Sequence, residues 1–250
     1  MEGPTEGRIH ARSEVDVSAA LAHVARLRED TGVRVTLTHL VGAALGRALR
    51  AVPEARARVV LGRIRPLEDC TVSFAVDIED GVDLGPVRVP DADRLSTVEI
   101  ARRLQSAVDA LRGGRDRHHR SSSALVRIAP RATMRPILSA ASVLVGGLGV
   151  PAFGQPGRPF GTAFVSNVGT LGLDEAYLAP VPFARTAVYL AVGAVADRPV
   201  VVDGQVVVRP VSVLVATADH RILDGAHAGR LQRVVTDLLA DPERLDRPAA

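Results

Sequence analysis

The 250-residue sequence contains no lysine, and all 31 of its basic residues are arginines. Without lysine the chain has no amine for Schiff-base chemistry, no phosphate-loop lysine and no side chain to carry a lipoyl or biotin group. Tryptophan is also absent, and aromatic residues make up 3% of the chain, which argues against a base-stacking surface for nucleic acid. The formal net charge of +3 is too small to indicate a nucleic-acid partner.

Cysteine and long apolar runs are scarce as well. Cys70 is the single cysteine of the sequence, so no internal disulfide can form. The longest apolar stretch, 140–153, is interrupted by serine, glycine and proline, whereas a bilayer span needs about 20 mostly apolar residues. The first 17 residues are polar and contain no apolar core of a secretory signal. These features predict a cytoplasmic protein without a transmembrane helix.

The composition that remains is that of a globular protein, with 47% hydrophobic and 24% charged residues. Apolar residues recur at helical spacing near 17–31, 38–52, 97–111 and 226–240. Strands are expected at 70–78, 162–166, 186–195 and 211–218, with a hairpin over 200–209 that turns at Asp203-Gly204, and 81–90 reads as an irregular connection. The pattern predicts an α/β two-layer sandwich, in which helices cover one face of a mixed β-sheet.

The domain organisation follows from changes in composition. Residues 1–12 are expected to form an N-terminal arm, either flexible or paired, and residues 13–250 a single domain. Within it, 113–160 is an atypical insertion, and the stretch 112–135 at its start contains seven arginines against Asp116. An amphipathic helix is expected after Pro136, with Ser139 and Ser142 opposite its apolar face. Packing within the protein's own assembly is the favoured role for this insertion, followed by docking of an acidic partner and then by binding to an anionic membrane.

The segment Asp219-His220-Arg221-Ile222-Leu223-Asp224-Gly225 is the strongest candidate for chemistry. It joins an expected buried strand to an expected helix, a position that can present the His220 imidazole to a cleft as a base. Asp224 can orient that ring or hold the turn through an arginine. The alternative is a structural histidine followed by an ordinary helix cap. His118 and His119 lack a carboxylate or cysteine partner at useful spacing, so no metal site is expected.

The sequence around this motif resembles the catalytic domain of the 2-oxo-acid dehydrogenase complex acyltransferases, which share their fold with chloramphenicol acetyltransferase. The resemblance covers about 13–112 and 161–245 and includes TADHRILDGAHAGRLQRVVTDLLADPERL, GTAFVSNVGTLGLDEAYLAPVPFARTAVYLAVGAVADRPVVVDGQVVVRP and VTLTHLVGAALGRALRAVPE. It implies a stand-alone form without lipoyl or subunit-binding domains, and the absent lysine excludes a lipoyl group on this chain.

By this resemblance, His220 matches the family's catalytic histidine, which deprotonates the thiol of coenzyme A or dihydrolipoamide. Ser166 matches the hydroxyl residue that hydrogen-bonds the tetrahedral oxyanion; on its own it would read as a turn residue at a strand end. Asp224 matches a residue that fixes the active-site loop through an ion pair with an N-terminal arginine, for which Arg8 and Arg12 are the candidates. Coenzyme A is therefore the expected co-substrate, and the identity of the acyl group stays open.

The resemblance also implies assembly, because the family builds each active site between two subunits of a trimer. A homo-oligomer built from trimers is expected, with a separate lipoyl-carrying protein or dehydrogenase subunits as partners. The alternative function is a catalytically idle core that scaffolds partner proteins, which the presence of both His220 and Ser166 disfavours. Two-lobed acyltransferases and condensation domains share the histidine motif, but 250 residues supply one lobe of the two that they require.

Overall fold

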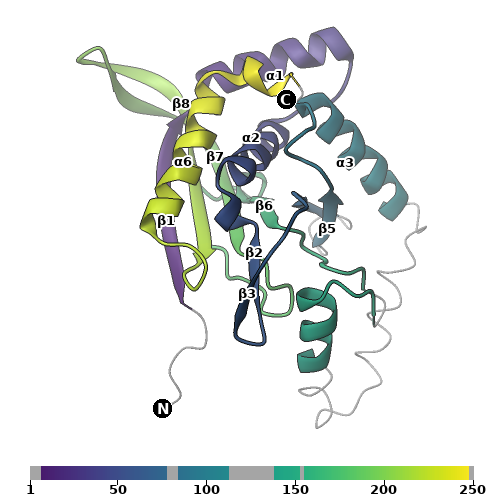
Figure 1. Ribbon diagram of the computed structural model, residues 1–250. Helices are drawn as coiled ribbons and strands as arrows, with labels where there is room; N and C mark the ends of the chain where they lie inside the picture. The colour runs from purple at the N-terminus through teal and green to yellow at the C-terminus, as the bar shows by residue number, and fades with distance from the viewer. Residues whose placement is uncertain (1–6, 78–83, 113–137, 153–154, 248–250) are drawn as a thin grey trace.

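The computed structural model describes residues 7–77, 84–112, 138–152 and 155–247 (Figure 1). The longer elements in chain order are β1 (Arg8–Asp16), α1 (Ser18–Thr31), α2 (Leu37–Ala51), β2 (Ala57–Val60), β3 (Arg63–Pro66), β4 (Val72–Asp77), β5 (Leu84–Val89), α3 (Thr97–Arg112), β6 (Ala163–Asn167), β7 (Val188–Val202), β8 (Gln205–Asp219) and α6 (Gly225–Ala240). The short helices are η1 (Pro53–Ala55), η2 (Ser142–Gly147), η3 (Val168–Leu171) and η4 (Pro242–Leu245).

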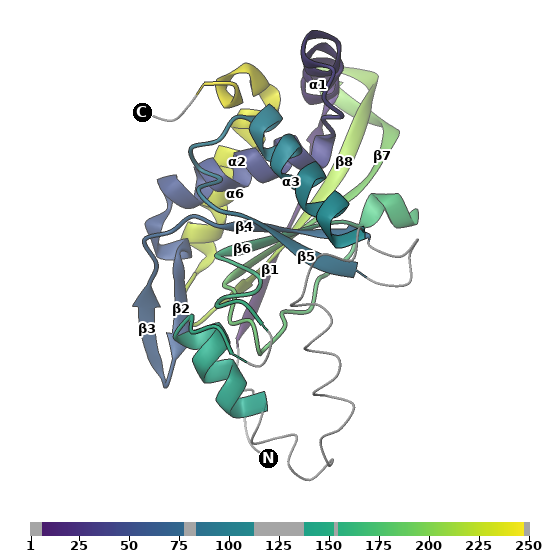
Figure 2. The same cartoon turned by 90° about the vertical axis from the view of Figure 1, so that its right-hand side faces the viewer.

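Six strands form the main sheet in the order β1-β8-β7-β6-β4-β5, and β2 and β3 form a separate hairpin. The sheet is mixed, because β6 runs parallel to both β4 and β7 whereas the other neighbouring pairs are antiparallel. The four long helices cover one face of this sheet (Figure 2). The predicted two-layer α/β sandwich is therefore confirmed.

The main hydrophobic core lies between the sheet and this helical layer. It combines inward-facing strand residues such as Phe74 and Val165 with α2 residues such as Leu40 and Leu49. Ten of the fifteen residues of α2 are buried, so this helix is enclosed between the sheet and its neighbouring helices. No helix among the described residues is long and apolar enough to cross a membrane.

Two boundaries differ from those expected. The segment 81–90 includes a strand, because β5 pairs antiparallel with β4 along 84–89. Pro86 concealed this strand in the sequence; it is tolerated because β5 is an edge strand, where a missing N–H need not break a ladder. At the N-terminus, residues 8–12 of the expected arm lie in β1, which pairs with β8 at the opposite edge of the sheet.

The hairpin at Asp203-Gly204 is longer than the sequence suggested. Strands β7 and β8 each run for 15 residues without a break between the expected hairpin and the expected sheet strands. Asp203 and Gly204 have φ of 50° and 78°, as the predicted type I′ turn requires. The outer half of the hairpin projects beyond the sheet as a two-stranded ribbon (Figure 1).

The expected helix after Pro136 is described from residue 138, where one turn of α-helix continues into the π-helical η2. Ala141 and Val145 are buried as expected, but Leu144 is 37% exposed and Ser142 is buried. The position of Ser142 opposite the apolar face was therefore wrong. The reason is tertiary, since Arg185 donates from Nε to both the carbonyl and the hydroxyl oxygen of Ser142 at 3.0 Å. The arginine-rich stretch 113–137 lies outside the described residues.

Helix α2 approaches the sheet closely at Gly42. A Cβ atom at this position would lie 2.2 Å from Cζ of Phe74 on β4. Gly42→Ala is therefore expected to lower the free energy of unfolding by at least about 1–3 kcal/mol, because the buried ring must move. Gly229→Ala in α6 is the matched control: its nearest atom outside the local backbone is 3.6 Å away, on flexible Arg233, and alanine favours a helix by about 0.5–1 kcal/mol. Urea denaturation of both variants measures the change in the free energy of unfolding. A loss in Gly229→Ala equal to the loss in Gly42→Ala would contradict the prediction.

The N-terminus of α2 carries a capping box in which Thr36 and His39 bond each other's backbone N–H groups. The backbone N–H of Thr36 donates to Nδ1 of His39 at 3.0 Å, which requires that nitrogen to be unprotonated. Burial, reinforced by the charges of Arg28 and Arg34, lowers the pKa of His39 from 6.5 to about 4. The folded protein thus holds His39 neutral.

A pH dependence of stability follows from the lowered pKa of His39. Because the folded-state pKa lies below the unfolded value, the stabilisation is complete above pH 6.5 and is lost as the pH falls toward 4. We expect the free energy of unfolding to drop by about 2–3 kcal/mol over this range relative to His39→Gln, which keeps an acceptor but does not titrate. Denaturant unfolding at pH 7 and pH 4.5 measures the difference. Parallel pH profiles of the two proteins would refute the assignment.

Candidate functional site

His220 lies immediately after β8, where the chain leaves the sheet to enter α6. Backbone hydrogen bonds hold this turn from both sides. The N–H of His220 donates to the carbonyl of Gly7 at 3.0 Å, and the N–H of Asp219 donates to the carbonyl of Ala187 at 3.0 Å. The N–H of Leu223 then bonds back to the carbonyl of Asp219 at 3.0 Å. The histidine is therefore exposed on a backbone that is held in place.

The orientation of the His220 ring follows from one contact. Its Nδ1 lies 2.8 Å from the carbonyl oxygen of Leu223. A carbonyl can only accept, so Nδ1 carries the proton in this bond and Nε2 keeps its lone pair. No described residue hydrogen-bonds Nε2, and the side chain is exposed. In the neutral ring, the arrangement leaves the lone pair of Nε2 accessible at the exposed end of β8, as a general base requires.

Residues on either side of His220 form an ion pair of their own. Arg221 donates from Nε to Oδ1 of Asp219 at 2.9 Å and from Nη2 to Oδ2 at 2.5 Å. Such two-point pairing between a guanidinium and a carboxylate restrains both groups. It satisfies the carboxylate nearest in sequence to His220 and leaves the imidazole bonded to a neutral carbonyl.

Among the described residues, Asp224 bonds His227 of α6, and no ion pair joins it to Arg12, one of the two arginines that the family resemblance suggested. Asp224 is the N-cap of α6: its Oδ1 accepts from the backbone N–H of His227 at 3.0 Å and lies 2.6 Å from Nδ1 of that ring. These hydrogen bonds lower the pKa of Asp224, with the bond from the His227 backbone as the largest cause. Arg12 instead pairs with Glu175 at 2.5 Å, because it lies opposite Val215, about 13 Å down β8 from the turn.

Ser166 lies on β6, beside Ala191 of β7. Side chains alternate along β6, so Val165 enters the helix-covered core and partly buried Ser166 faces the other side of the sheet. The end of the strand is anchored by Asn167, which donates from Nδ2 to the hydroxyl of Thr38 at 2.6 Å. No described residue hydrogen-bonds the Ser166 hydroxyl. It is positioned by a rigid strand and has capacity to donate.

The structure does not bring Ser166 and His220 together within one chain. The register places Ser166 level with Val215 on β8, five residues before His220 and two strands away. This corresponds to about 17 Å along the strands and about 10 Å across them. The separation of the two backbones is therefore about 19 Å, far beyond what a serine and a histidine side chain can bridge.

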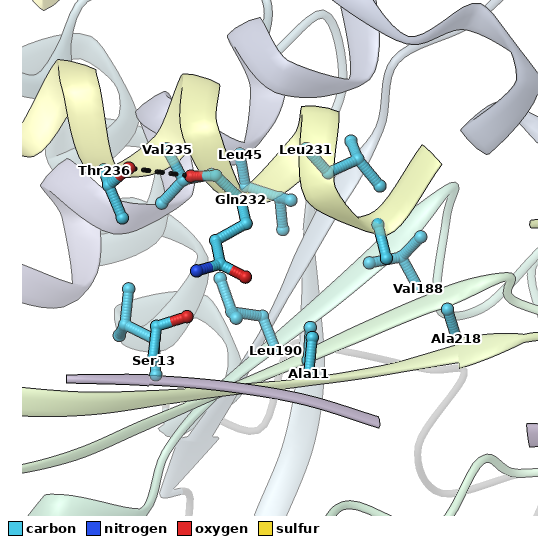
Figure 3. A pocket seen from close by; sticks show the side chains of 13 residues that line it. Ala11, Ser13, Leu45, Val188, Leu190, Ala218, Leu231, Gln232, Val235 and Thr236 are labelled. Atoms are coloured by element: carbon cyan, nitrogen blue, oxygen red, sulfur yellow. Dashed lines mark hydrogen bonds between the residues drawn. The ribbon is translucent and has the colours of Figure 1, made fainter. Parts of the chain in front are cut away.

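A pocket in the helix-covered face is separate from these residues. About 50 Å³ of space lies between α6 and strands β1, β7 and β8, and its lining is apolar, with Ala11, Leu190 and Leu231 among the lining residues (Figure 3). Gln232 and Ser13 supply polar atoms beside it. The space is too small for a cofactor and touches neither His220 nor Ser166. It is a packing void of the core.

The other candidate side chains have structural contacts. His23 is 3% exposed and bonds Asp246 from Nε2 at 3.1 Å. Cys70 precedes β4 and is buried. Burial raises the pKa of its thiol to about 12, which disfavours a nucleophilic thiolate. Within the described part of the chain, no three histidine, cysteine or acidic side chains are grouped to hold a metal ion. His118 and His119 lie outside the described residues.

Sequence reasoning identified the motif residues but missed the group that orients them. The carbonyl of Leu223 and the anchor from Asn167 to Thr38 have no signature in the sequence. A backbone carbonyl is present at every position, and the partner of Asn167 is 129 residues away.

Comparisons with known proteins concern the sequence and the fold of this chain. A protein-family model described as the catalytic domain of 2-oxoacid dehydrogenases acyltransferase matches residues 7–126 and 160–246. A curated relative, the dihydrolipoyllysine-residue acetyltransferase component of the pyruvate dehydrogenase complex of Mycoplasma capricolum, is 27% identical over 214 residues. The aligned part covers 85% of this chain and 40% of the relative. The chain thus spans less than half the length of that relative.

Two solved structures show the similarity in fold. The cubic core of the pyruvate dehydrogenase multienzyme complex has a TM-score of 0.69 at 19% identity, covering 96% of this chain and 84% of that chain. Chloramphenicol acetyltransferase has a TM-score of 0.52 at 15% identity, covering 94% and 89%. The fold is therefore the chloramphenicol acetyltransferase-like fold that the sequence predicted.

Proposed function

The chain belongs to the family of 2-oxoacid dehydrogenase acyltransferase catalytic domains, and from this membership we propose that it moves an acyl group between coenzyme A and a thiol acceptor, such as dihydrolipoamide on a separate protein. The observation that carries the proposal is the orientation of His220, whose Nδ1 is held by the Leu223 carbonyl so that Nε2 can accept a proton. A scaffold has no need for this arrangement.

In the proposed reaction, Nε2 of His220 takes the proton from the acceptor thiol. A free thiol has a pKa near 8.5, so a positioned base increases the share of thiolate at neutral pH. The thiolate sulfur attacks the carbonyl carbon of the acyl thioester, and the electron pair of the C=O bond moves onto oxygen. The Ser166 hydroxyl donates a hydrogen bond to that oxyanion. When the C=O bond re-forms, the donor thiolate leaves and takes the proton back from His220.

We propose that two copies of the chain complete each site. The support is the separation of about 19 Å between Ser166 and His220 in one chain, which a second copy must bridge. A site that uses a different surface from each of two copies is heterologous, and such contacts close into a ring, here a trimer. The solved cubic core, to which this fold is similar, is by its name an assembly of many chains.

The partners follow from the same proposal. These 250 residues contain no lysine to carry a lipoyl group, and we propose that a separate protein supplies the lipoyl-bearing substrate. Subunits of a 2-oxoacid dehydrogenase complex are the expected source of that protein. The acyl group is left open, since nothing around the described site selects its length.

Chromatographic measurement of the coenzyme A released from a panel of acyl-coenzyme A donors, with free dihydrolipoamide as acceptor, tests the activity. We expect transfer with at least one donor, and light scattering at micromolar concentration is expected to show a trimer or a multiple of it. A stable monomer would contradict both the shared site and the activity. An assembly that transfers no acyl group from any donor would favour the idle scaffold.

A further inference from the structure

Arginine side chains from four separate parts of the chain gather around the helical segment 138–147. One comes from β2, one from β5, one from the segment before β6 and one from the residues before β7. We refer to them together as the arginine cluster, which comprises Arg58, Arg88, Arg158 and Arg185. Figure 2 shows the helical segment beside the β2–β3 hairpin.

Hydrogen bonds to the same short segments place two members of the cluster next to each other. Arg58 donates from Nη1 to the carbonyl of Gly146, near the C-terminus of η2. Arg185 donates from Nε to the carbonyl of Ser142 at 3.0 Å, on the same helix. Its Nη1 also donates to the carbonyl of Val59 at 2.7 Å, one residue after Arg58. The two guanidinium groups therefore flank η2 from one side.

The other two members are connected through Asp69. Arg158 donates from Nη1 to Oδ1 of Asp69, and its backbone N–H donates to the carbonyl of Val145 at 2.9 Å. The Thr71 hydroxyl donates to Oδ2 of Asp69 at 3.0 Å just before β4, the strand that pairs with β5 and its Arg88. The pKa of Arg88 is lowered most by burial, raised by Asp69 and lowered by Arg158. The cluster is thus continuous from η2 to β5.

The hydrogen-bonding capacity of this cluster is not filled by the described residues. Arg58 is 2% exposed, yet its Nε and Nη2 are buried and bond to no described residue. The buried Nε of Arg88 is likewise without a partner among them, as is the hydroxyl of Ser73, which is opposite Arg88 across β4 and β5. Buried donors of this kind cost free energy when they stay unpaired.

The charge of the cluster is unbalanced as well. Asp69 is the carboxylate that acts on the pKa of both Arg58 and Arg88, and Arg158 already bonds it. The pKa of Arg58 is lowered to about 10, chiefly by burial and also by Arg158 and Arg185, while Asp69 raises it. Several guanidinium groups therefore share one carboxylate, and the nearly fully buried Arg58 in particular favours an added negative charge beside it.

We propose that the arginine cluster is a binding site for a phosphate group. A phosphate carries nearly two negative charges and several acceptor oxygens, which match the unpaired donors of Arg58, Arg88 and Ser73. Two sources share this chemistry: free inorganic phosphate and a phosphate of coenzyme A. The site does not depend on the proposed acyl transfer.

The dipole of η2 accounts for only part of the arrangement. Cations are favourable near the C-terminus of a helix, and Arg58 and Arg185 do bond its carbonyls. Those contacts use Nη1 of Arg58 and leave its Nε and Nη2 buried and unpaired. They also involve neither Arg88 nor Ser73. The dipole therefore does not account for the unpaired donors of the cluster.

The position of the cluster suits a ligand that also reaches the candidate active site. Arg185 lines a small crevice of about 20 Å³ that Asp219 and Arg221 also line, next to His220. Arg158 and η2 lie in 127–159, between the two parts of the chain that the family model matches. The cluster thus combines the family fold with a segment that the family model does not describe.

Binding of inorganic phosphate to the full chain tests the site by calorimetry and by thermal unfolding at matched ionic strength in chloride. We expect saturable binding, with a Tm rise of about 5 °C or more at a hundredfold excess over Kd. Arg58→Gln should weaken phosphate binding by about 10- to 100-fold. Arg88→Gln, at a half-buried position, should weaken it too and serves if the first variant does not fold. Asp69→Asn should strengthen binding, because it removes the competing carboxylate.

Arg102→Gln on the exposed surface of α3 is the matched control, since it removes the same charge outside the cluster. It should bind phosphate like the parent protein. Absence of binding, or an equal Tm rise in the parent, Arg58→Gln and Arg88→Gln, would overturn the proposal, because a general salt effect does not depend on one arginine.

Coenzyme A and dephospho-coenzyme A, which lacks the 3′-phosphate, distinguish the two sources. If the 3′-phosphate fills the site, Arg58→Gln weakens binding of coenzyme A but not of dephospho-coenzyme A, and inorganic phosphate competes with coenzyme A. If free phosphate fills it, both coenzyme forms bind the parent and the variant equally. Phosphate binding in a protein that transfers no acyl group would sustain this site while refuting the proposed function.

Discussion

His220→Ala is expected to lower kcat/KM for acyl transfer by about 10²- to 10⁴-fold, the usual contribution of a positioned general base. The variant loses the nitrogen that accepts the thiol proton, so the attacking group is mainly the weaker nucleophile, the neutral thiol. Folding should be preserved, because the imidazole is exposed and its side-chain hydrogen bond within the described part of the chain is to the Leu223 carbonyl. The release of coenzyme A measured at neutral pH, together with the Tm and the size of the assembly, checks the result.

His23→Gln is the matched control for that variant. His23 is a buried histidine on α1 that bonds Asp246, the residue after η4. Glutamine at this position can still donate to Asp246. The rate of this variant should equal that of the parent protein. If His220→Ala retained the parent rate in the same assay, His220 would not be the base, and the motif would be structural.

Mixed assemblies of two inactive variants should regain activity, because we propose that each site draws His220 from one copy and Ser166 from its neighbour. Ser166→Ala alone should lower kcat by about 10²- to 10³-fold, as loss of one oxyanion donor does. When Ser166→Ala and His220→Ala chains are unfolded together and refolded at equal amounts, about a quarter of the contacts pair an intact serine with an intact histidine. The mixture should then recover about a quarter of the parent rate.

The same two variants, refolded separately and mixed afterwards without exchange of chains, form the control and should stay inactive. Co-refolded mixtures that remained as slow as the separate variants would show that both residues act within one chain. Such a result would contradict the register of β6, β7 and β8, which holds the two backbones about 19 Å apart.

The sequence predicted what depends on neighbours along the chain. Ser96 and Glu99 have the spacing of a capping box and bond each other's backbone, and Asp203-Gly204 forms the expected turn. These features follow from side chains three or fewer positions apart, so they require no knowledge of the fold. Strand β5 escaped detection because Pro86 suggests a break, and its position at the edge of the sheet, which makes proline harmless, is a property of the whole sheet.

The sequence alone thus determined the fold class, the family and the candidate residues His220 and Ser166. Periodicity and motifs depend on residues that are close together in the sequence, so they can be recognised without the fold. The tertiary structure decided that Leu223 orients His220, that Asp224 caps α6, and that Ser166 lies too far from His220 to share a site with it in one chain. It also decided that Arg58, Arg88 and Arg158, which are far apart in the sequence, lie near one carboxylate, that of Asp69. Register, burial and the pairing of charges arise between segments far apart in the chain, and they exist only once the sheet has formed and its faces have been covered.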